Sequence, residues 1–214
     1  MNDCEYRSRM FPNTGFIEAK LTEEQLAPVK FEINNIQSNF KNLNNIEHNN
    51  SLAGNIERAF KLIDSKNHLQ NILLPLVKLF DNNFDYIKDF DHLTVDSPII
   101  LDTVWVNFQK KTEFNPWHAH HGILSFVIWI YVPYDYNDEL KYTPGSRSNA
   151  PSAGTFAFSY TNSLGRINTF SIPVDKSMEG SLVLFSSKLL HTVYPFYTSD
   201  DYRISVSGNF KFDV

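Results

Sequence analysis

Three histidines lie within four residues of this chain, immediately before a long apolar run. The segment is NPWHAHHGILSFVIWI, and the histidines are His118, His120 and His121. Residues two apart in an extended chain point to the same side, so His118 and His120 are expected to face together and His121 to face away. Two imidazoles on neighbouring rungs of a strand can bind one metal ion, each at about 2.1 Å. The spacing therefore indicates two ligands of a metal site.

A third ligand has to come from a distant part of the chain, and His191 in SSKLLHTVYPF is the best candidate. It stands at the start of a predicted strand, whereas His48, His68 and His92 lie in the N-terminal half without a comparable setting. The alternative is that these histidines are partly buried or surface residues with no ligand role.

A second polar pattern occurs near the C-terminus, in YRISVSGNF. Arg203, Ser205, Ser207 and Asn209 alternate, so all four point to one face of the predicted strand. Either this face lines a polar cavity or it is exposed to solvent. A buried guanidinium needs an anionic partner, and a bidentate carboxylate is the natural one.

The segment YTSDD between these two C-terminal strands predicts a hairpin turn. With a bulge or an odd number of unpaired residues, His191 and Arg203 would share a face about 10 Å apart. That separation suits a small dicarboxylate with one end on the metal and the other on the guanidinium.

The elements that position these residues change in character near residue 95. Before it, the sequence predicts helices at 22–40, 51–64 and 67–84, the first beginning with a capping box of Thr22 and Gln25. After it, β-branched and aromatic segments predict strands at 98–109, 123–133, 153–162, 166–174, 180–187, 191–196 and 202–212. The polar stretch 134–154 is predicted to be a long loop.

This order predicts a mainly β fold with N-terminal helices: a jelly roll, or double-stranded β-helix, of the cupin-like kind. We expect one domain over 1–214, with a helical bracing region at 1–94 and the β core at 95–214. The run at 123–133 is apolar on both faces and is expected to be central in a sheet.

Composition limits the functional classes. The formal net charge is −5, which makes binding to duplex nucleic acid unlikely on charge grounds. A single cysteine, Cys4, excludes an internal disulfide and favours a reducing, cytoplasmic setting. No apolar window is long enough for a membrane span, and neither a GxSxG motif nor a phosphate-binding loop is present.

Taken together, the H-x-H before an apolar strand, the distal histidine and the later R-x-S resemble the iron(II)- and 2-oxoglutarate-dependent dioxygenases. The resemblance covers about residues 98–212, and within it the segment NPWHAHHGILSFVIWI is most similar to the short oxygenases often encoded by bacteriophages. The resemblance implies hydroxylation of an unidentified substrate, with release of succinate and carbon dioxide. The reaction is expected in the cytoplasm, which includes the cytoplasm of a phage-infected host cell.

The resemblance also implies roles for residues. His118 and His191 become iron ligands, with no catalytic residue beyond the ligands. The family usually has Asp or Glu two residues after the first histidine, where this chain has His120. Three histidines then hold the iron, or His120 lies behind the ligands and a water replaces it. In a shifted register, His120 is the first ligand, Gly122 takes the carboxylate position and His121 swings in.

For the cosubstrate, the resemblance implies that Arg203 and Ser205 bind the far carboxylate of 2-oxoglutarate. Asn107 and Tyr131 on neighbouring strands are expected to add hydrogen bonds. His121 and Asn209 are expected to lie behind these groups.

Two other classes remain open. One is a cupin-like metal protein without 2-oxoglutarate, which has no need of Arg203. The other is a non-enzymatic β-sandwich. The prime substrate is not indicated, and a peptide, a nucleobase or a small metabolite all fit such a core.

Overall fold

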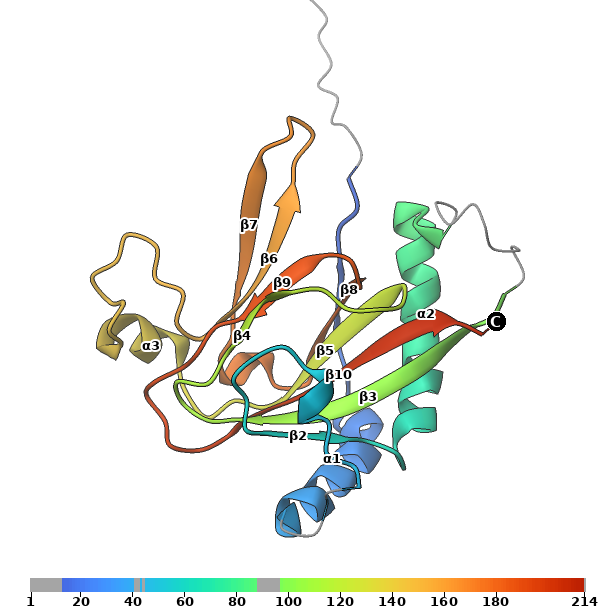
Figure 1. Ribbon diagram of the computed structural model, residues 1–214, viewed down its shortest axis with the longest axis horizontal. Coiled ribbons are helices and arrows are strands. Elements are labelled where there is room, and N and C mark those ends of the chain that lie inside the picture. The colour runs from blue at the N-terminus through green and yellow to red at the C-terminus, as the bar shows by residue number, and fades with distance from the viewer. Residues whose placement is uncertain (1–12, 41–42, 44, 88–96, 214) are drawn as a thin grey trace, which may run out of the picture.

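The computed structural model describes residues 13–40, 43, 45–87 and 97–213, which contain two β-sheets and three α-helices (Figure 1). The strands are β1 (Ile17–Lys20), β2 (Arg58–Lys61), β3 (Ile99–Gln109), β4 (Asn115–His118), β5 (Leu124–Tyr131), β6 (Thr155–Thr161), β7 (Ile167–Pro173), β8 (Ser181–Ser186), β9 (Leu190–Val193) and β10 (Arg203–Phe212). The helices are α1 (Glu23–Ser38), α2 (Lys66–Phe84) and α3 (Tyr136–Tyr142), with short 3-10 turns η2 (Asn49–Ser51) and η4 (Lys176–Met178).

The strands form a large and a small antiparallel sheet. The large sheet has the order β1-β8-β5-β10-β3-β2, and the small sheet has the order β4-β9-β6-β7. The two sheets form the layers of a jelly roll, which confirms the predicted fold class. The β6–β7 hairpin, predicted from the turn between them, projects beyond the rest of the small sheet (Figure 1).

Strand β5 is buried on both faces because it lies between two hydrophobic cores. Its even-numbered residues, such as Phe126 and Ile128, pack toward the helices, and Val127 and Trp129 pack toward the small sheet. Its neighbours are β8 and β10, so the predicted central strand is confirmed. This explains why 123–130 is apolar without alternation except at Ser125.

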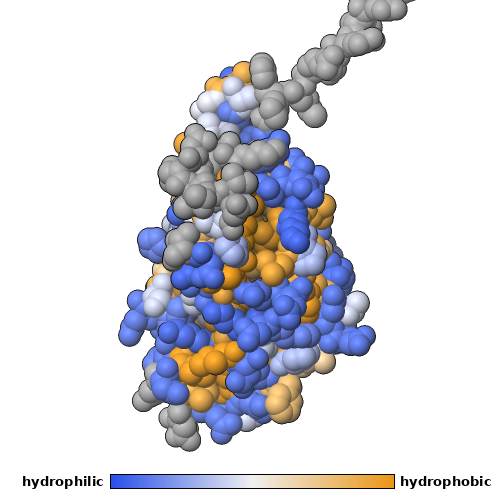
Figure 2. Space-filling view, turned by 90° about the vertical axis from the view of Figure 1, so that its right-hand side faces the viewer, coloured by the Kyte–Doolittle hydropathy of each residue, from blue (hydrophilic) through white to orange (hydrophobic). Residues whose placement is uncertain are grey.

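Helices α1 and α2 cover the outer face of the large sheet (Figure 1). The capping box that begins α1 is present: Thr22 Oγ1 accepts from Gln25 N, and Gln25 Oε1 accepts from Thr22 N. One stripe of α2 is buried, formed by Leu69, Leu73, Val77 and Phe80 at three- and four-residue steps. On the side of the molecule that carries α2, hydrophilic side chains separate several hydrophobic patches (Figure 2).

The N-terminal region differs from the prediction in one segment. Residues 51–64 are not a helix: η2 ends there at Ser51, and β2 pairs with β3. Gly54 explains the break, because its φ of 131° lies outside the helical region. The region before residue 95 therefore contributes β1 and β2 to the large sheet as well as two helices.

The stretch 134–154 also differs, since it contains α3. Asp135 caps this helix by accepting from Asn137 N. Glu139 of α3 is fully buried and accepts hydrogen bonds from Tyr197 N, Thr198 N and the Thr198 hydroxyl. These bonds hold α3 against the segment that joins β9 to β10.

Candidate metal and cosubstrate site

Three histidines converge on one point at the edge of the small sheet. His118 on β4 is paired directly with His191 on β9, and His120 follows just after β4 ends. One ligand nitrogen from each of the three lies within 4.8 Å of the others. The position of His120 is fixed by its backbone, which donates from N to Ser187 O at 2.8 Å.

Hydrogen bonds behind the rings orient two of these histidines. His118 Nδ1 lies 2.7 Å from Pro116 O, and His191 Nδ1 lies 2.9 Å from Leu189 O. A carbonyl oxygen can only accept, so in both rings Nδ1 carries the proton and Nε2 keeps its lone pair. A histidine that binds a metal typically has this arrangement.

The histidines are neutral at neutral pH. Burial, and then the charge of His118, lower the pKa of His191 to about 3. Burial, followed by the charges of His118 and His121, lowers the pKa of His120 to about 4. The pKa of His118 is also lowered, mainly by burial. Protons therefore do not compete for these nitrogens at physiological pH.

The cluster contains no carboxylate among the residues that the structure describes. Its members are His118, His120 and His191, all of which were predicted ligands. His121 is exposed and lies outside the cluster. Gly122 adopts a φ of 87°, and a Cβ there would lie 2.4 Å from Phe210 O, so this residue makes the turn into β5.

A cavity between the two sheets joins the histidine cluster to Arg203. Its lining includes all three histidines together with Arg203, Ser205 and Ser207. The alternating polar face of β10 therefore lines a cavity and is not a solvent-exposed face, while Ile204, Val206 and Phe210 lie in the core against the helices.

Arg203 is 2% exposed and is held by neutral groups. Its Nε and Nη2 donate to Gln109 Oε1 at 3.2 and 2.6 Å, and Nη2 also donates to Tyr194 O at 3.0 Å. Its Nη1 donates to the Tyr134 hydroxyl at 2.6 Å. None of the described carboxylates forms an ion pair with it. A buried positive charge without a counter-charge is costly, so this arrangement favours an anionic ligand.

Residues 103–209 match the family model described as "Putative 2OG-Fe(II) oxygenase". The chain belongs to this family. The oxygenase uses iron(II) and 2-oxoglutarate, and the alternatives of a cupin-like protein without cosubstrate and of a non-enzymatic sandwich are set aside.

Solved structures share its fold. A prolyl-4-hydroxylase from Pseudomonas putida is 12% identical, with a TM-score of 0.55 over 92% of each chain. A prolyl hydroxylase from Trichoplax adhaerens, in complex with a peptide fragment of hypoxia inducible factor, is 12% identical with a TM-score of 0.54, over 93% of this chain and 83% of that one. A non-heme alpha ketoglutarate dependent epimerase from nogalamycin biosynthesis is 11% identical with a TM-score of 0.52, over 92% and 77%. No curated protein matched the sequence.

The donors present in the oxygenase fit the metal that the family uses. Three neutral imidazoles with free lone pairs are suitable ligands for a divalent first-row ion. All three approach from two neighbouring segments of the small sheet, and the cavity extends from them toward Arg203.

The remaining predicted cosubstrate residues lie in different places. Asn107 is buried in the same cavity, and its Oδ1 has no hydrogen-bond partner in the described structure. Tyr131 is 42% exposed and is not among the residues that line the cavity, so its predicted hydrogen bond to the cosubstrate stays a prediction without support from its position. The Asn209 side-chain oxygen accepts a hydrogen bond from the Ser125 hydroxyl at 2.7 Å. Asn209 lies toward the C-terminal end of β10, whereas Arg203 begins the strand.

The predicted hairpin between the last two strands is also wrong. Strand β9 pairs with β4 and β6 in the small sheet, whereas β10 pairs with β3 and β5 in the large sheet. His191 and Arg203 share the cavity because they face each other from different sheets. Gln109 and Tyr134, which bind Arg203, were not predicted; Gln109 follows Asn107 at a two-residue step, and that spacing was the available signal.

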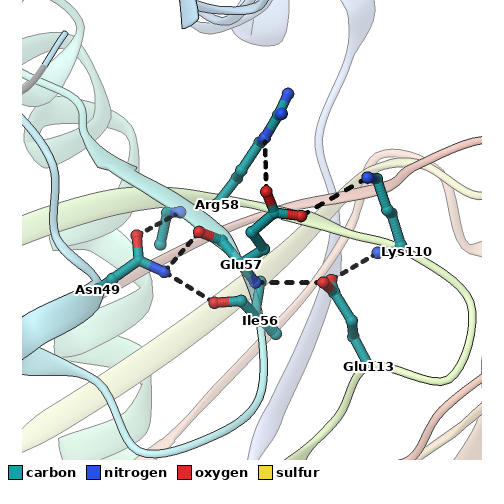
Figure 3. Close-up of polar contacts among 7 residues, drawn as sticks. Asn49, Ile56, Glu57, Arg58, Lys110 and Glu113 are labelled. Carbon is teal, nitrogen blue, oxygen red and sulfur yellow. Dashed lines mark hydrogen bonds and ion pairs between the residues drawn. The ribbon is translucent and has the colours of Figure 1, made fainter. Parts of the chain in front are cut away.

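A loop at 51–57 covers part of the cavity, to which it contributes Leu52, Ala53 and Ile56. The Asn49 side chain ties this loop together by donating to Ile56 O and Glu57 O and accepting from Ala59 N (Figure 3). The loop is joined to the β3–β4 turn through Glu57, whose carboxylate pairs with Lys110.

The structure has no helix, among the residues that it describes, with the length and apolar character needed to cross a bilayer.

Proposed function

We propose that His118, His120 and His191 hold the iron of this oxygenase and that Arg203 binds the far carboxylate of 2-oxoglutarate. The observation that carries the proposal is the buried guanidinium of Arg203, which has no anionic partner among the described residues and lies in the same cavity as the three imidazoles. When bound, iron and 2-oxoglutarate activate oxygen for insertion into a substrate C–H bond, with succinate and carbon dioxide as by-products.

The residues around Arg203 prepare it for a carboxylate. Gln109, Tyr134 and the Tyr194 carbonyl fix the plane of the guanidinium, and the Phe196 ring centroid lies 5.5 Å from its Cζ. This support limits the entropy lost when a ligand binds. Ser205, two residues along β10, adds a hydroxyl on the same face.

Asn107 is proposed to bind the cosubstrate as well. It is paired with Ser205 across β3 and β10, and its buried side-chain oxygen lacks a partner within the described residues. 2-Oxoglutarate has only acceptor oxygens, so Asn107 would donate to it from its side-chain N–H groups, while an ordered water would satisfy the side-chain oxygen. The apolar walls from Val127, Trp129 and Phe185 exclude water from the reacting atoms.

The decisive experiment measures cosubstrate binding without turnover. Manganese(II) replaces iron, and the dissociation constant of 2-oxoglutarate is measured by calorimetry under air-free conditions. Arg203→Ala is expected to raise this constant by about 30-fold or more, equivalent to about 2 kcal/mol. Arg147→Ala, at an exposed position, is the matched control and should leave it unchanged.

An Arg203→Ala variant that folds, binds manganese and keeps the wild-type constant for 2-oxoglutarate would contradict the assignment. Melting temperature reports folding separately, because the change also removes hydrogen bonds to Gln109 and Tyr134.

The setting of the reaction is proposed on sequence grounds. The similarity to phage-encoded oxygenases and the single cysteine support action in the reducing cytoplasm, including that of a phage-infected host. The negative net charge supports a substrate other than duplex nucleic acid. The division into a bracing region and a core at residue 95 stays a prediction.

A further inference from the structure

A groove opens beside the cluster of three histidines. It shares His118 and His120 with the cavity described above, but Arg203 does not line it. It runs past Trp105 and His48 to Lys61 on β2 and Asn209 on β10. Because the cluster stands at one end, a molecule in this groove places a bond next to the metal position while 2-oxoglutarate occupies the Arg203 side.

One wall of the groove is formed by three neighbouring aromatic rings, which are tilted against one another by 43° and 65°. The His48 and Trp105 ring centroids are 5.2 Å apart, and those of Trp105 and His120 are 5.6 Å apart. The pKa of His48 is lowered by burial and by the charge of Lys61, so its ring is neutral and offers an uncharged face. Flat side chains of this kind pack well against a planar ligand group.

The polar lining favours a negative ligand. Asp102 is the only acidic side chain that lines the groove in the described structure, and it is bound by Lys211 Nζ at 3.0 Å. The Lys211 hydrogen bond is also the main reason why the pKa of this carboxyl is lowered. By contrast, Lys61 lines the groove without an ion-pair partner among the described residues.

Two further groups point to a missing ligand. The Asn209 side-chain oxygen is used by the Ser125 hydroxyl, which leaves its amide N–H groups as donors at the groove. His48 is 7% exposed, and its Nδ1 has no hydrogen-bond partner in the described part of the chain. A buried polar atom without a partner calls for an explanation, and a ligand or bound water in the groove supplies one.

We propose that this groove binds the prime substrate of the oxygenase, and that the substrate is a small anion with a planar group. The planar group packs on Trp105 and His48, and the anionic group lies toward Lys61. The inference rests on the proposed function, because it takes the metal position to be at the three histidines.

The experiment uses matched probes that differ in one property. Benzoate, benzamide and benzamidinium share a ring and carry charges of −1, 0 and +1, while cyclohexanecarboxylate is an anion without a planar ring. Each is titrated into protein saturated with manganese(II) and 2-oxoglutarate, so that the Arg203 site is already filled, and binding is followed by Trp fluorescence and thermal shift. Benzoate is expected to bind at least about tenfold more tightly than each of the other three.

Lys61→Gln tests the origin of the charge preference. Lys61 is exposed, so this variant is expected to fold normally and to reduce the benzoate preference over benzamide by at least about fivefold. Lys78→Gln is the control, because Lys78 is exposed on α2 and does not line the groove. This variant should keep the full preference.

Equal binding of benzoate and benzamide, no saturable benzoate binding at all, or an unchanged preference in Lys61→Gln would each overturn the inference. These outcomes leave the proposed function intact if manganese and 2-oxoglutarate still bind. Conversely, failure of 2-oxoglutarate to bind would be seen in the saturation step, before any probe is added.

Discussion

His118 and His191 face each other directly across strands β4 and β9, with ring centroids 4.2 Å apart. Both rings have Nδ1 within hydrogen-bond distance of a carbonyl two residues earlier in their own segments, Pro116 and Leu189. Two segments that are distant in the sequence thus orient their histidine rings in the same way, toward the same point. His120 reaches this point from the turn after β4, at centroid distances of 4.9 Å from His118 and 5.0 Å from His191.

Replacing His191 by Ala should abolish turnover of 2-oxoglutarate. Loss of a group that only supports a ligand costs about 10–100-fold in metal affinity or activity, so loss of a proposed ligand should cost more than about 100-fold. Succinate release and manganese(II) binding, measured on the same preparation, check this. His68→Gln is the control, because His68 bonds to Gln25 O between α1 and α2 and lies outside the cluster. Wild-type succinate release from His191→Ala would end the metal assignment.

Replacing His120 by Asp tests the most unusual feature of the site. The change supplies the carboxylate that the family usually has and makes the ligand set one unit more negative. A harder oxygen ligand favours iron(II) and manganese(II) over zinc. We expect the affinity ratio of iron(II) to zinc to rise by about tenfold in an air-free competition measurement.

His120→Gln is the neutral comparison for that experiment, and its ratio should not rise. Succinate release then separates two outcomes for function. Higher turnover in His120→Asp would identify the native ligand set as a departure from a better one. Loss of turnover would identify the three-histidine arrangement as the functional one.

The sequence was sufficient to predict the jelly roll, the central strand β5 and the convergence of His118, His120 and His191. These depend on periodicity and on residue type, which a single sequence displays. The pairing partners of β9 and β10 were not predictable, because a turn such as YTSDD connects strands equally well within one sheet or between two. Gln109 and Tyr134 were missed since their role depends on Arg203 being buried beside them, which only the fold determines. In the segment 51–64, apolar spacing indicated a helix, but pairing with β3 and the backbone at Gly54 outweigh that preference.

The histidine cluster should make the metal-free protein sensitive to mild acid. The pKa of His191 is about 3 in the folded protein and about 6.5 in the unfolded chain. Below pH 6.5 the unfolded state therefore binds a proton that the folded state does not, so stability falls as the pH falls toward 3. At pH 5 this group alone has lost about 2 kcal/mol of unfolding free energy relative to pH 7. His120, with a pKa of about 4, acts in the same direction.

Urea denaturation in the presence of a chelator, at pH 7, 6 and 5, checks this. His191→Gln removes one titrating group, so its stability should decline less steeply than that of the wild type over this range. Parallel curves for the two proteins would contradict the lowered pKa of His191. Added zinc or manganese should raise the wild-type stability at each pH without flattening its decline, because the metal stabilises only the folded state and the unfolded chain still takes up its protons.

The loop that covers the cavity is held together by the Asn49 side chain. The Asn49 amide bonds to Ile56 O at 2.7 Å, to Glu57 O at 2.9 Å and to Ala59 N at 2.9 Å, and it holds Leu52, Ala53 and Ile56 over the cavity (Figure 3). Asn49→Ala removes all three bonds, so local opening of residues 51–57 should cost about 1–3 kcal/mol less than in the wild type. Hydrogen exchange should then be at least about fivefold faster in this loop, with little change in β3 or β5. Asn83→Ala, which removes one exposed bond to Leu79 O on α2, is the control. Unchanged exchange in the loop would show that its packing, rather than the Asn49 amide, keeps the cavity covered.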